Sequence, residues 1–89
     1  MKAWKFLNKH KWCRGASALS AKGRLVDVTS KSAVSFCLIG AIEAVYRKKA
    51  EQAFRPLLEK LGPLMISDWN DNVCKSKRQA VALLKKLDI

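Results

Sequence analysis

The chain has 89 residues, of which 49% are hydrophobic, and its 18 Lys and Arg residues stand against only 7 Asp and Glu residues, for a formal net charge of +11. This length suffices for one domain, which buries roughly 60–65% of the surface of its unfolded chain. Because a small domain with so much like charge repels itself, an anionic partner is the simplest counterweight. Residues 1–49 hold eleven of the basic residues and only two acidic ones.

Hydropathy and cysteine usage exclude three further classes of protein. Lysines interrupt the first twelve residues, so no secretory signal is predicted there. The most apolar stretch, residues 33–45, is shorter than the roughly 20 residues that cross a bilayer. Three widely spaced cysteines, an odd number, favour reduced thiols over a disulfide framework. We therefore expect a cytoplasmic protein with no membrane partner.

The first predicted elements are a short helix and a hairpin. Residues 3–10 place apolar side chains on one helical face and the lysines Lys2, Lys5 and Lys9 on another. Short alternating segments on both sides of Gly23 predict a small β-hairpin over residues 15–28, in which the glycine takes the positive φ of a tight turn.

A central apolar helix is predicted next. Thr29 or Ser30 is placed to cap it, and the chain is apolar on nearly every face up to about Val45. Gly40 within this helix costs about 1 kcal/mol relative to alanine. Its expected use is therefore to let another backbone approach closely.

The apolar positions of residues 50–61 fall on one stripe and predict a third helix. Pro56 either kinks this helix or begins a new one, because proline lacks the amide hydrogen that the helix interior needs. Gly62 and Pro63 are expected to end it, since glycine accepts the left-handed conformation and proline cannot continue a helix.

The last predicted helix begins at a capping box, with Ser76 and Gln79 three residues apart and an apolar stripe after them. No repeat, low-complexity tract or long linker divides the chain, so residues 1–89 are predicted to form a single domain. The expected fold class is mainly α: a compact helical domain around a central apolar helix, with a small β-hairpin near residues 15–28.

Three short motifs carry a resemblance to a known family. The sequence has WCxGA at residues 12–16, CLxGA at residues 37–41 and WND at residues 69–71. In this order they resemble the signatures of an uncharacterised family of small bacterial and phage proteins, and the resemblance covers most of the chain. It implies a shared fold but no activity, because the family has none established. The chain departs from the family's pattern at residues 73–75, where a proline- and glycine-containing turn is more typical.

Few residues are suited to catalysis. The candidates for acid–base work are one histidine, His10, and acidic residues that are mostly isolated along the sequence. Asp68 and Asp71 flank Trp69, but Asp is also a usual loop and capping residue, and we favour that interpretation. No phosphate-binding glycine loop is present. We expect a protein that is not an enzyme.

A zinc site is the formal alternative for the cysteines. His10, Cys13, Cys37 and Cys74 would supply one imidazole and three sulfurs. Zinc ligands usually come as close pairs on tight turns, and only the pair His10 and Cys13 has such spacing. We therefore predict no metal and no cofactor, with Cys37 packed as a small apolar side chain.

Two clusters of basic residues are candidate anion-binding sites. The first surrounds the start of the last helix, where the helix dipole disfavours each exposed cation by about 0.3–1 kcal/mol and where a phosphate would offset this cost; it consists of Lys75, Lys77 and Arg78. The second follows the N-terminal helix and consists of Lys2, Lys5, Lys9, Lys11 and Arg14. The alternative for both clusters is a solvated basic surface that maintains solubility.

Aromatic residues lie among the N-terminal lysines, namely Trp4, Phe6 and Trp12. Such rings can stack on exposed bases. At helical spacing they also serve as core anchors, and we favour that second interpretation. A basic amphipathic helix can lie on an anionic membrane as well, but this one is short and weakly apolar, so nucleic acid ranks above membrane.

The sequence thus predicts a small basic, non-catalytic binding protein that contacts the phosphate backbone of DNA or RNA through its Lys and Arg clusters. Low sequence specificity is expected, because no recognition-helix or RNA-binding signature is present. The alternative is a phage-type inhibitor or adaptor that docks on an acidic protein surface of a host nucleic-acid machine, because basic charge suits both partners.

Overall fold

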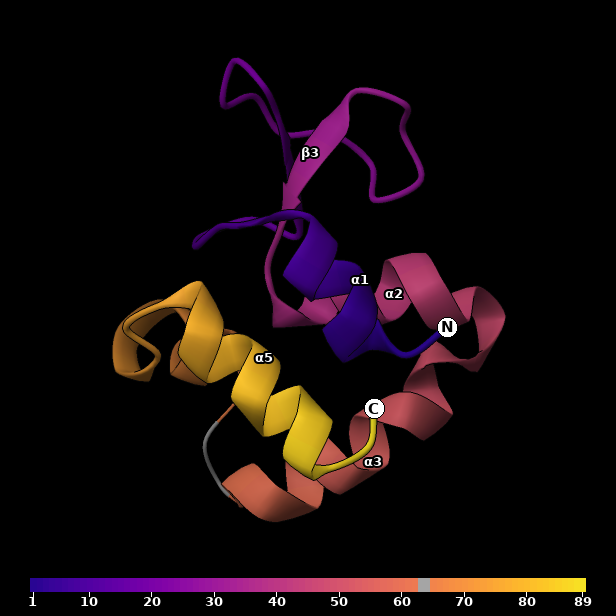
Figure 1. Cartoon of the computed structure of the whole chain (residues 1–89), viewed down its shortest axis with the longest axis vertical. Helices are drawn as coiled ribbons and strands as arrows, with labels where there is room; N and C mark the ends of the chain where they lie inside the picture. Colours follow the sequence, from indigo (N-terminus) through magenta and orange to yellow (C-terminus); the bar gives the residue numbers. More distant parts are fainter. Residues whose placement is uncertain (63–64) are drawn as a thin grey trace.

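The structure is a computed structural model that describes residues 1–62 and 65–89. Most of the described chain is helical, which confirms the mainly α prediction. Figure 1 shows the small sheet and its loops at one end of the molecule and the longer helices at the other. The helical segments are α1 (Ala3–Lys9), α2 (Leu38–Tyr46), η1 (Arg47–Lys49), α3 (Ala50–Leu61), α4 (Ile66–Asp68), the π-helical turn η2 (Trp69–Val73) and α5 (Lys77–Lys86).

The sheet has three short strands in the order β1-β3-β2, which are β1 (Lys11–Trp12), β2 (Ala18–Ser20) and β3 (Ala33–Phe36). Strand β1 runs parallel to β3, with Trp12 opposite Phe36, whereas β2 runs antiparallel, with Ala18 opposite the same Phe36. The central strand β3 therefore has both edges paired.

The predicted hairpin over residues 15–28 is only partly correct. The turn forms as expected: Gly23 has φ +78°, and its N–H donates to the Ser20 carbonyl at 2.9 Å. Beyond the turn the chain makes only an isolated bridge between Leu19 and Leu25, and β2 takes β3 as its strand partner instead. Leu25 is 77% exposed whereas Phe36 is 3% exposed, so pairing with β3 buries apolar surface that the nearer segment leaves in water.

The predicted central helix is wrong in its first part. Residues 33–36 form β3, and α2 begins only at Leu38, so neither Thr29 nor Ser30 caps it. The N-cap is Cys37, which has extended backbone and whose sulfur accepts the Gly40 N–H at 3.3 Å. An apolar run covered on both sides has the same pattern in a strand and in a buried helix, so periodicity alone did not separate the two.

The flanking helices form where they were predicted. Helix α1 buries Ala3 and Leu7, and α3 runs without interruption through Pro56, so this proline does not begin a new helix. At the end of α3 the backbone of Gly62 has φ +63°, as expected for a helix-ending glycine. Pro63, which was expected to follow as a stop, lies outside the described residues.

The capping box of α5 is confirmed with one change. The Ser76 hydroxyl accepts the N–H of Gln79 at 3.3 Å, as predicted. The Gln79 side chain returns to the N–H of Lys75 at 2.7 Å, one residue before the position that a standard capping box uses. The backbone N–H groups of Lys75 and Gln79, at the start of α5, therefore already have side-chain hydrogen-bond partners.

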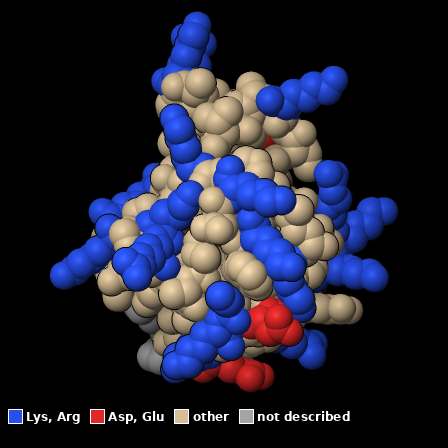
Figure 2. Space-filling view, viewed as in Figure 1, with Lys and Arg blue, Asp and Glu red and all other residues tan. Residues whose placement is uncertain are grey.

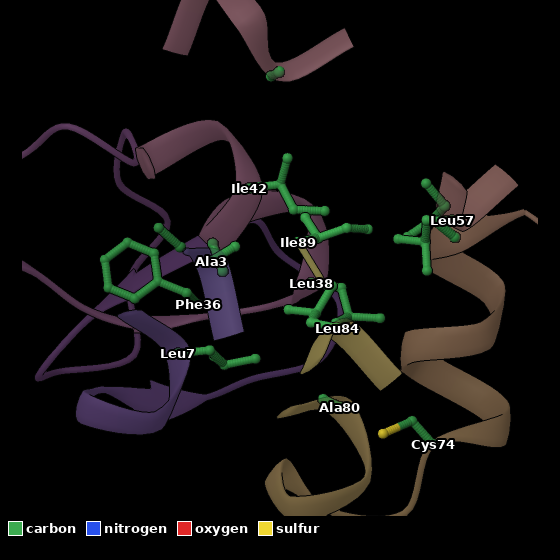
Figure 3. Packing of buried hydrophobic residues seen from close by; sticks show 14 residues of the cluster. Ala3, Leu7, Phe36, Leu38, Ile42, Leu57, Cys74, Ala80, Leu84 and Ile89 are labelled. Carbon is green, nitrogen blue, oxygen red and sulfur yellow. The ribbon is translucent and has the colours of Figure 1, made fainter. Parts of the chain in front are cut away.

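The core lies between α1, α2, α3 and α5. Figure 3 shows Leu38, Ile42, Leu84 and Ile89 gathered between α2 and α5, with Leu7 and Ala3 facing them from α1. Ile89 is itself buried, and its carbonyl accepts the Ala3 N–H at 2.7 Å, which joins the start of α1 to the segment after α5. Among the described helices, none has both the length and the apolar character that a membrane span requires.

Candidate functional site

Helices α1 and α5 lie side by side and antiparallel, and this pairing builds the candidate site. At one end the Ala3 N–H reaches Ile89, and at the other the Lys77 ammonium donates to the carbonyls of Asn8 and His10 at 3.1 and 3.0 Å. Each helix buries two residues that are four positions apart in sequence. They are Ala3 and Leu7 in α1, and Ala80 and Leu84 in α5. Their outer sides remain in solvent.

This pairing brings together the two basic clusters that the sequence left apart. The Lys77 contacts join the entrance of α5 to the end of α1, and the Arg14 guanidinium donates to the Cys74 carbonyl. We call the resulting surface the basic face; it comprises Lys2, Lys5, Lys9, Lys11, Arg14, Lys75, Lys77, Arg78 and Lys85. Figure 2 shows Lys and Arg side chains across the side that α1 and α5 present, with Asp and Glu at its lower end.

Positive charge is not confined to this surface. Figure 2 also shows basic side chains projecting from the end of the molecule where Figure 1 places the sheet. Exposed Lys22, Arg24 and Lys31 come from the loops there. The exposed run Arg47, Lys48 and Lys49 adds further positive charge. The basic face is therefore one part of a wider positive surface.

Very little of this charge is neutralised within the protein. In residues 1–62 and 65–89 a single ion pair forms, between Lys2 Nζ and Asp88 Oδ2 at 3.4 Å. The same ammonium donates to the Asp88 carbonyl at 3.0 Å. Apart from Arg14 and Lys77, which donate to backbone carbonyls, the other Lys and Arg side chains of the basic face are left for solvent or for a partner.

Two members of the basic face also hold the fold together. Lys77 gives two of its three ammonium donors to carbonyls at the end of α1, so one donor remains for a ligand. Arg14 lies over the Trp12 ring at 5.1 Å while it donates to Cys74. Arg14 is exposed despite these contacts, and Lys5, Lys9, Lys11, Lys75 and Arg78 are exposed as well. The exposed members are the ones best placed to contact a phosphate.

The aromatic side chains near this face have different roles. Trp12 is half-buried and donates its indole N–H to Asn70 Oδ1 at 2.8 Å, and Phe6 stacks on His10 with ring centres 4.1 Å apart. Both serve as core anchors, the interpretation that we favoured. Trp4 is half-buried as well, but the ammonium groups of Lys5 and Lys85 lie 5.4 and 5.2 Å from its ring centre.

The sequence assigned no role to Asn70 beyond its place in the WND motif, and it did not include Lys85 among the basic candidates. The Asn70 side chain is fully buried in η2 and makes four hydrogen bonds. Oδ1 accepts the indole N–H of Trp12 and the backbone N–H of Leu38, the latter at 3.1 Å. Nδ2 donates to the Cys13 carbonyl at 3.1 Å and to Asp71 Oδ1 at 2.9 Å. One amide thus connects the segments after β1 and β3 with η2.

The position of Asn70 completes the sheet. The last rung between β1 and β3 is the Cys13 N–H bonded to the Phe36 carbonyl at 3.1 Å. The next rung of a parallel ladder would join the Leu38 N–H to the Cys13 carbonyl. Asn70 instead occupies this place, accepting from the first group and donating to the second. The strands can therefore separate there without leaving a buried backbone group unpaired.

Asp71 binds the loop beside this amide. Its Oδ1 accepts the Gly15 N–H at 3.0 Å in addition to the Asn70 amide. These two hydrogen bonds lower the pKa of the Asp71 carboxyl below its usual value. Asp71 therefore acts as a loop-binding residue, in agreement with the sequence-based interpretation.

The motifs that meet around Asn70 are those that carried the family resemblance. A model of a family of unknown function (DUF6197) matches residues 2–87. The chain belongs to the DUF6197 family. No curated protein and no solved structure matches it. The expectation of an uncharacterised family is thereby confirmed. Because the function of DUF6197 is unknown, membership in it assigns no activity to the site.

The remaining candidates for chemistry have structural partners in this DUF6197 protein. The His10 ring stacks on Phe6, and its Nδ1 lies 2.7 Å from the Phe6 carbonyl. Burial, followed by the proximity of Cys37 and Asp71, raises the pKa of the Cys13 thiol to about 11. In the described part of the chain no three His, Cys, Asp or Glu side chains converge to hold a metal ion. The formal zinc set of His10 and the cysteines is therefore not assembled there.

The raised pKa of Cys13 predicts slow alkylation. Because burial favours the neutral thiol and raises its pKa from 9.0 to about 11, the folded protein holds about a hundredfold less thiolate at pH 8 than the unfolded chain. The stabilisation linked to this shift is complete below pH 9 and is lost as the pH rises toward 11. Iodoacetamide labelling, mapped by mass spectrometry, should accelerate about tenfold per pH unit. Equal rates in folded and urea-unfolded protein at pH 8 would contradict this expectation.

Proposed function

We propose that this DUF6197 protein is a small, non-catalytic nucleic-acid-binding protein whose basic face contacts phosphates. The observation that carries the proposal is the joining of two basic clusters, more than sixty residues apart in sequence, through the contacts of Lys77 and Arg14. Phosphate contacts fix position without reading bases, so little sequence specificity is expected.

The number of free cations in the basic face determines how steeply the affinity for DNA should depend on salt concentration. Of the nine residues in the basic face, Lys2 is paired with Asp88, and Lys77 and Arg14 donate to backbone carbonyls. About six cations are then free to meet phosphates, and each releases condensed counterions when it binds duplex DNA. The logarithm of affinity should therefore fall with the logarithm of salt concentration with a slope of about −5.

The test is an anisotropy titration with random-sequence DNA and RNA at several salt concentrations. Lys75 and Arg78 are reversed to Glu together, while Lys77 is kept because its ammonium holds α1 to α5. This double variant should lose at least about tenfold in affinity, and its salt slope should become shallower by about two.

The matched control reverses Lys22 and Arg24, two exposed basic residues in the turn after β2. It changes the net charge equally, so it should reduce affinity less than the Lys75 and Arg78 variant does. Equal losses in both variants would show that a diffuse positive coat binds instead of an organised face. Failure of the unaltered protein to bind any nucleic acid at low salt would refute the proposed function.

A second candidate function is the phage-type inhibitor or adaptor that docks on an acidic protein surface. One further feature favours it: an apolar groove of about 230 Å³ lies between α2, α3 and α4 and is lined by Ile39, Glu51, Phe54, Leu58 and Ile66. Leu58 is 49% exposed. Exposed apolar surface of this kind is typical of protein-binding sites.

The same titration separates the two functions. Absence of nucleic-acid binding, together with a host protein whose capture is abolished by Leu58→Glu, would favour the adaptor. Retention of that capture in the Leu58→Glu variant would remove the groove from consideration. Leu25→Glu, which makes the same change at a leucine that is 77% exposed in the loop after β2, serves as the surface control.

A further inference from the structure

We infer that Trp4 is a base-stacking platform within the basic face, which makes single-stranded nucleic acid the preferred ligand. This inference rests on the proposed function and names its ligand class. It concerns one aromatic side chain in α1, a helix whose outer side carries Lys5 and Lys9.

Trp4 is the aromatic ring of this face that remains suited to a ligand. Trp12 holds Asn70 through its indole N–H, and Phe6 lies against His10 and Phe36, with ring centres 4.1 and 4.8 Å away. Neither ring can leave these partners without disturbing the core. Trp4 instead packs at the margin of the core and stays partly open to solvent.

The surroundings of Trp4 match the chemistry of a nucleotide. Lys5 Nζ and Lys85 Nζ lie 5.4 and 5.2 Å from its ring centre, so ammonium groups from two helices lie close to the indole. A base that stacks on the indole brings its phosphates to the same place. Both lysine side chains are long and exposed, so they can swing from the ring to the phosphates when the base arrives.

A duplex offers no unstacked base for the Trp4 ring to bind. In a double helix the bases are stacked on one another, so only the phosphates reach the basic face. In a single strand an unpaired base can stack on an aromatic ring, a contact that every base can make because each has a π-face. The expected signature is therefore a preference for single strands that does not depend on base identity.

The inference is tested with fluorescein-labelled oligo(dT), oligo(U) and their duplexes, each of about 12 nucleotides, the length scale of one small binding surface. The unaltered protein should bind at least one single strand about tenfold more tightly than its duplex. Trp4→Leu should abolish this preference while duplex affinity and the salt slope stay unchanged. Trp69→Leu, which removes another half-buried tryptophan far along the sequence, is the matched control and should retain the preference.

A second measurement avoids any dependence on the folding of the variants. Photocrosslinking of the unaltered protein to an oligonucleotide containing 5-iodouracil, followed by mass spectrometry, should place the major crosslink on Trp4. Equal affinity for single strand and duplex, or a major crosslink elsewhere, would overturn the stacking role while the phosphate-binding function stands. If neither form of nucleic acid binds, the proposed function fails, and this inference fails with it.

Discussion

Replacing Asn70 by alanine is expected to lower the free energy of unfolding by about 3–5 kcal/mol. The side chain is fully buried, and its removal leaves the Trp12 indole N–H, the Leu38 N–H and the Cys13 carbonyl without partners. Each buried polar group that loses its partner costs about 1–3 kcal/mol, and water entering the small cavity would recover part of that cost.

Urea unfolding followed by circular dichroism measures this loss, and Asn72→Ala is the matched control. Asn72 lies two residues further along in the same π-helical turn but is exposed, so its replacement should change stability by less than about 0.5 kcal/mol. If the two variants were equally stable, the amide of Asn70 would not be joining the strands. Loss of the sheet should accompany the Asn70 variant, because the segments after β1 and β3 meet through this amide.

Helices α1, α3 and α5 were predictable because their signals are local. The stripe of apolar residues in α3, the glycine after it and the Ser76 cap of α5 each lie within a few residues of the feature that they determine. The strand β3 was not predictable in this way. Three of its four residues are apolar, and only pairing with β1 and β2, about twenty residues earlier, decides between strand and helix.

Asn70 shows a similar limit for the site. An asparagine in a short polar segment is typical of a turn, and nothing in residues 69–71 alone reveals that the side chain is buried. Its importance arises from Trp12 and Leu38, which reach it from positions 58 and 32 residues away. Before the structure, only the family resemblance linked the WCxGA, CLxGA and WND motifs, and it gave no physical reason why they should meet.

The basic residues were predictable in part, because their positions on each helix are local features whereas the pairing of the helices is not. Their types and helical spacing follow directly from the sequence, and so do the apolar faces of α1 and α5. The antiparallel pairing of the two helices does not, since it depends on tertiary contacts between the ends of the chain. Nor did the sequence reveal that Lys77 gives two of its donors to α1, which changes it from a free cation into a residue that positions the face.

Replacing Gly40 by alanine is expected to lower the free energy of unfolding by about 3 kcal/mol or more, although helix propensity alone predicts a gain of about 1 kcal/mol. A Cβ atom at this position would lie 1.8 Å from the Ser17 carbonyl oxygen and 2.7 Å from its carbon. Both are backbone atoms, so relief requires α2 and the segment before β2 to separate. This close approach of backbones is the role predicted for Gly40 from the sequence.

Separation of these segments also breaks a hydrogen bond, because the same Ser17 carbonyl accepts the Cys37 N–H at 3.3 Å. Gly23→Ala is the matched control, since Gly23 has φ +78° but no neighbouring atom within 4 Å of an added Cβ. Its cost should be limited to backbone strain of about 1–2 kcal/mol. Urea denaturation should therefore rank Gly40→Ala as clearly less stable than Gly23→Ala. The reverse order would mean that α2 can move away from Ser17 at little cost, and that the contact does not fix the position of the helix against the sheet.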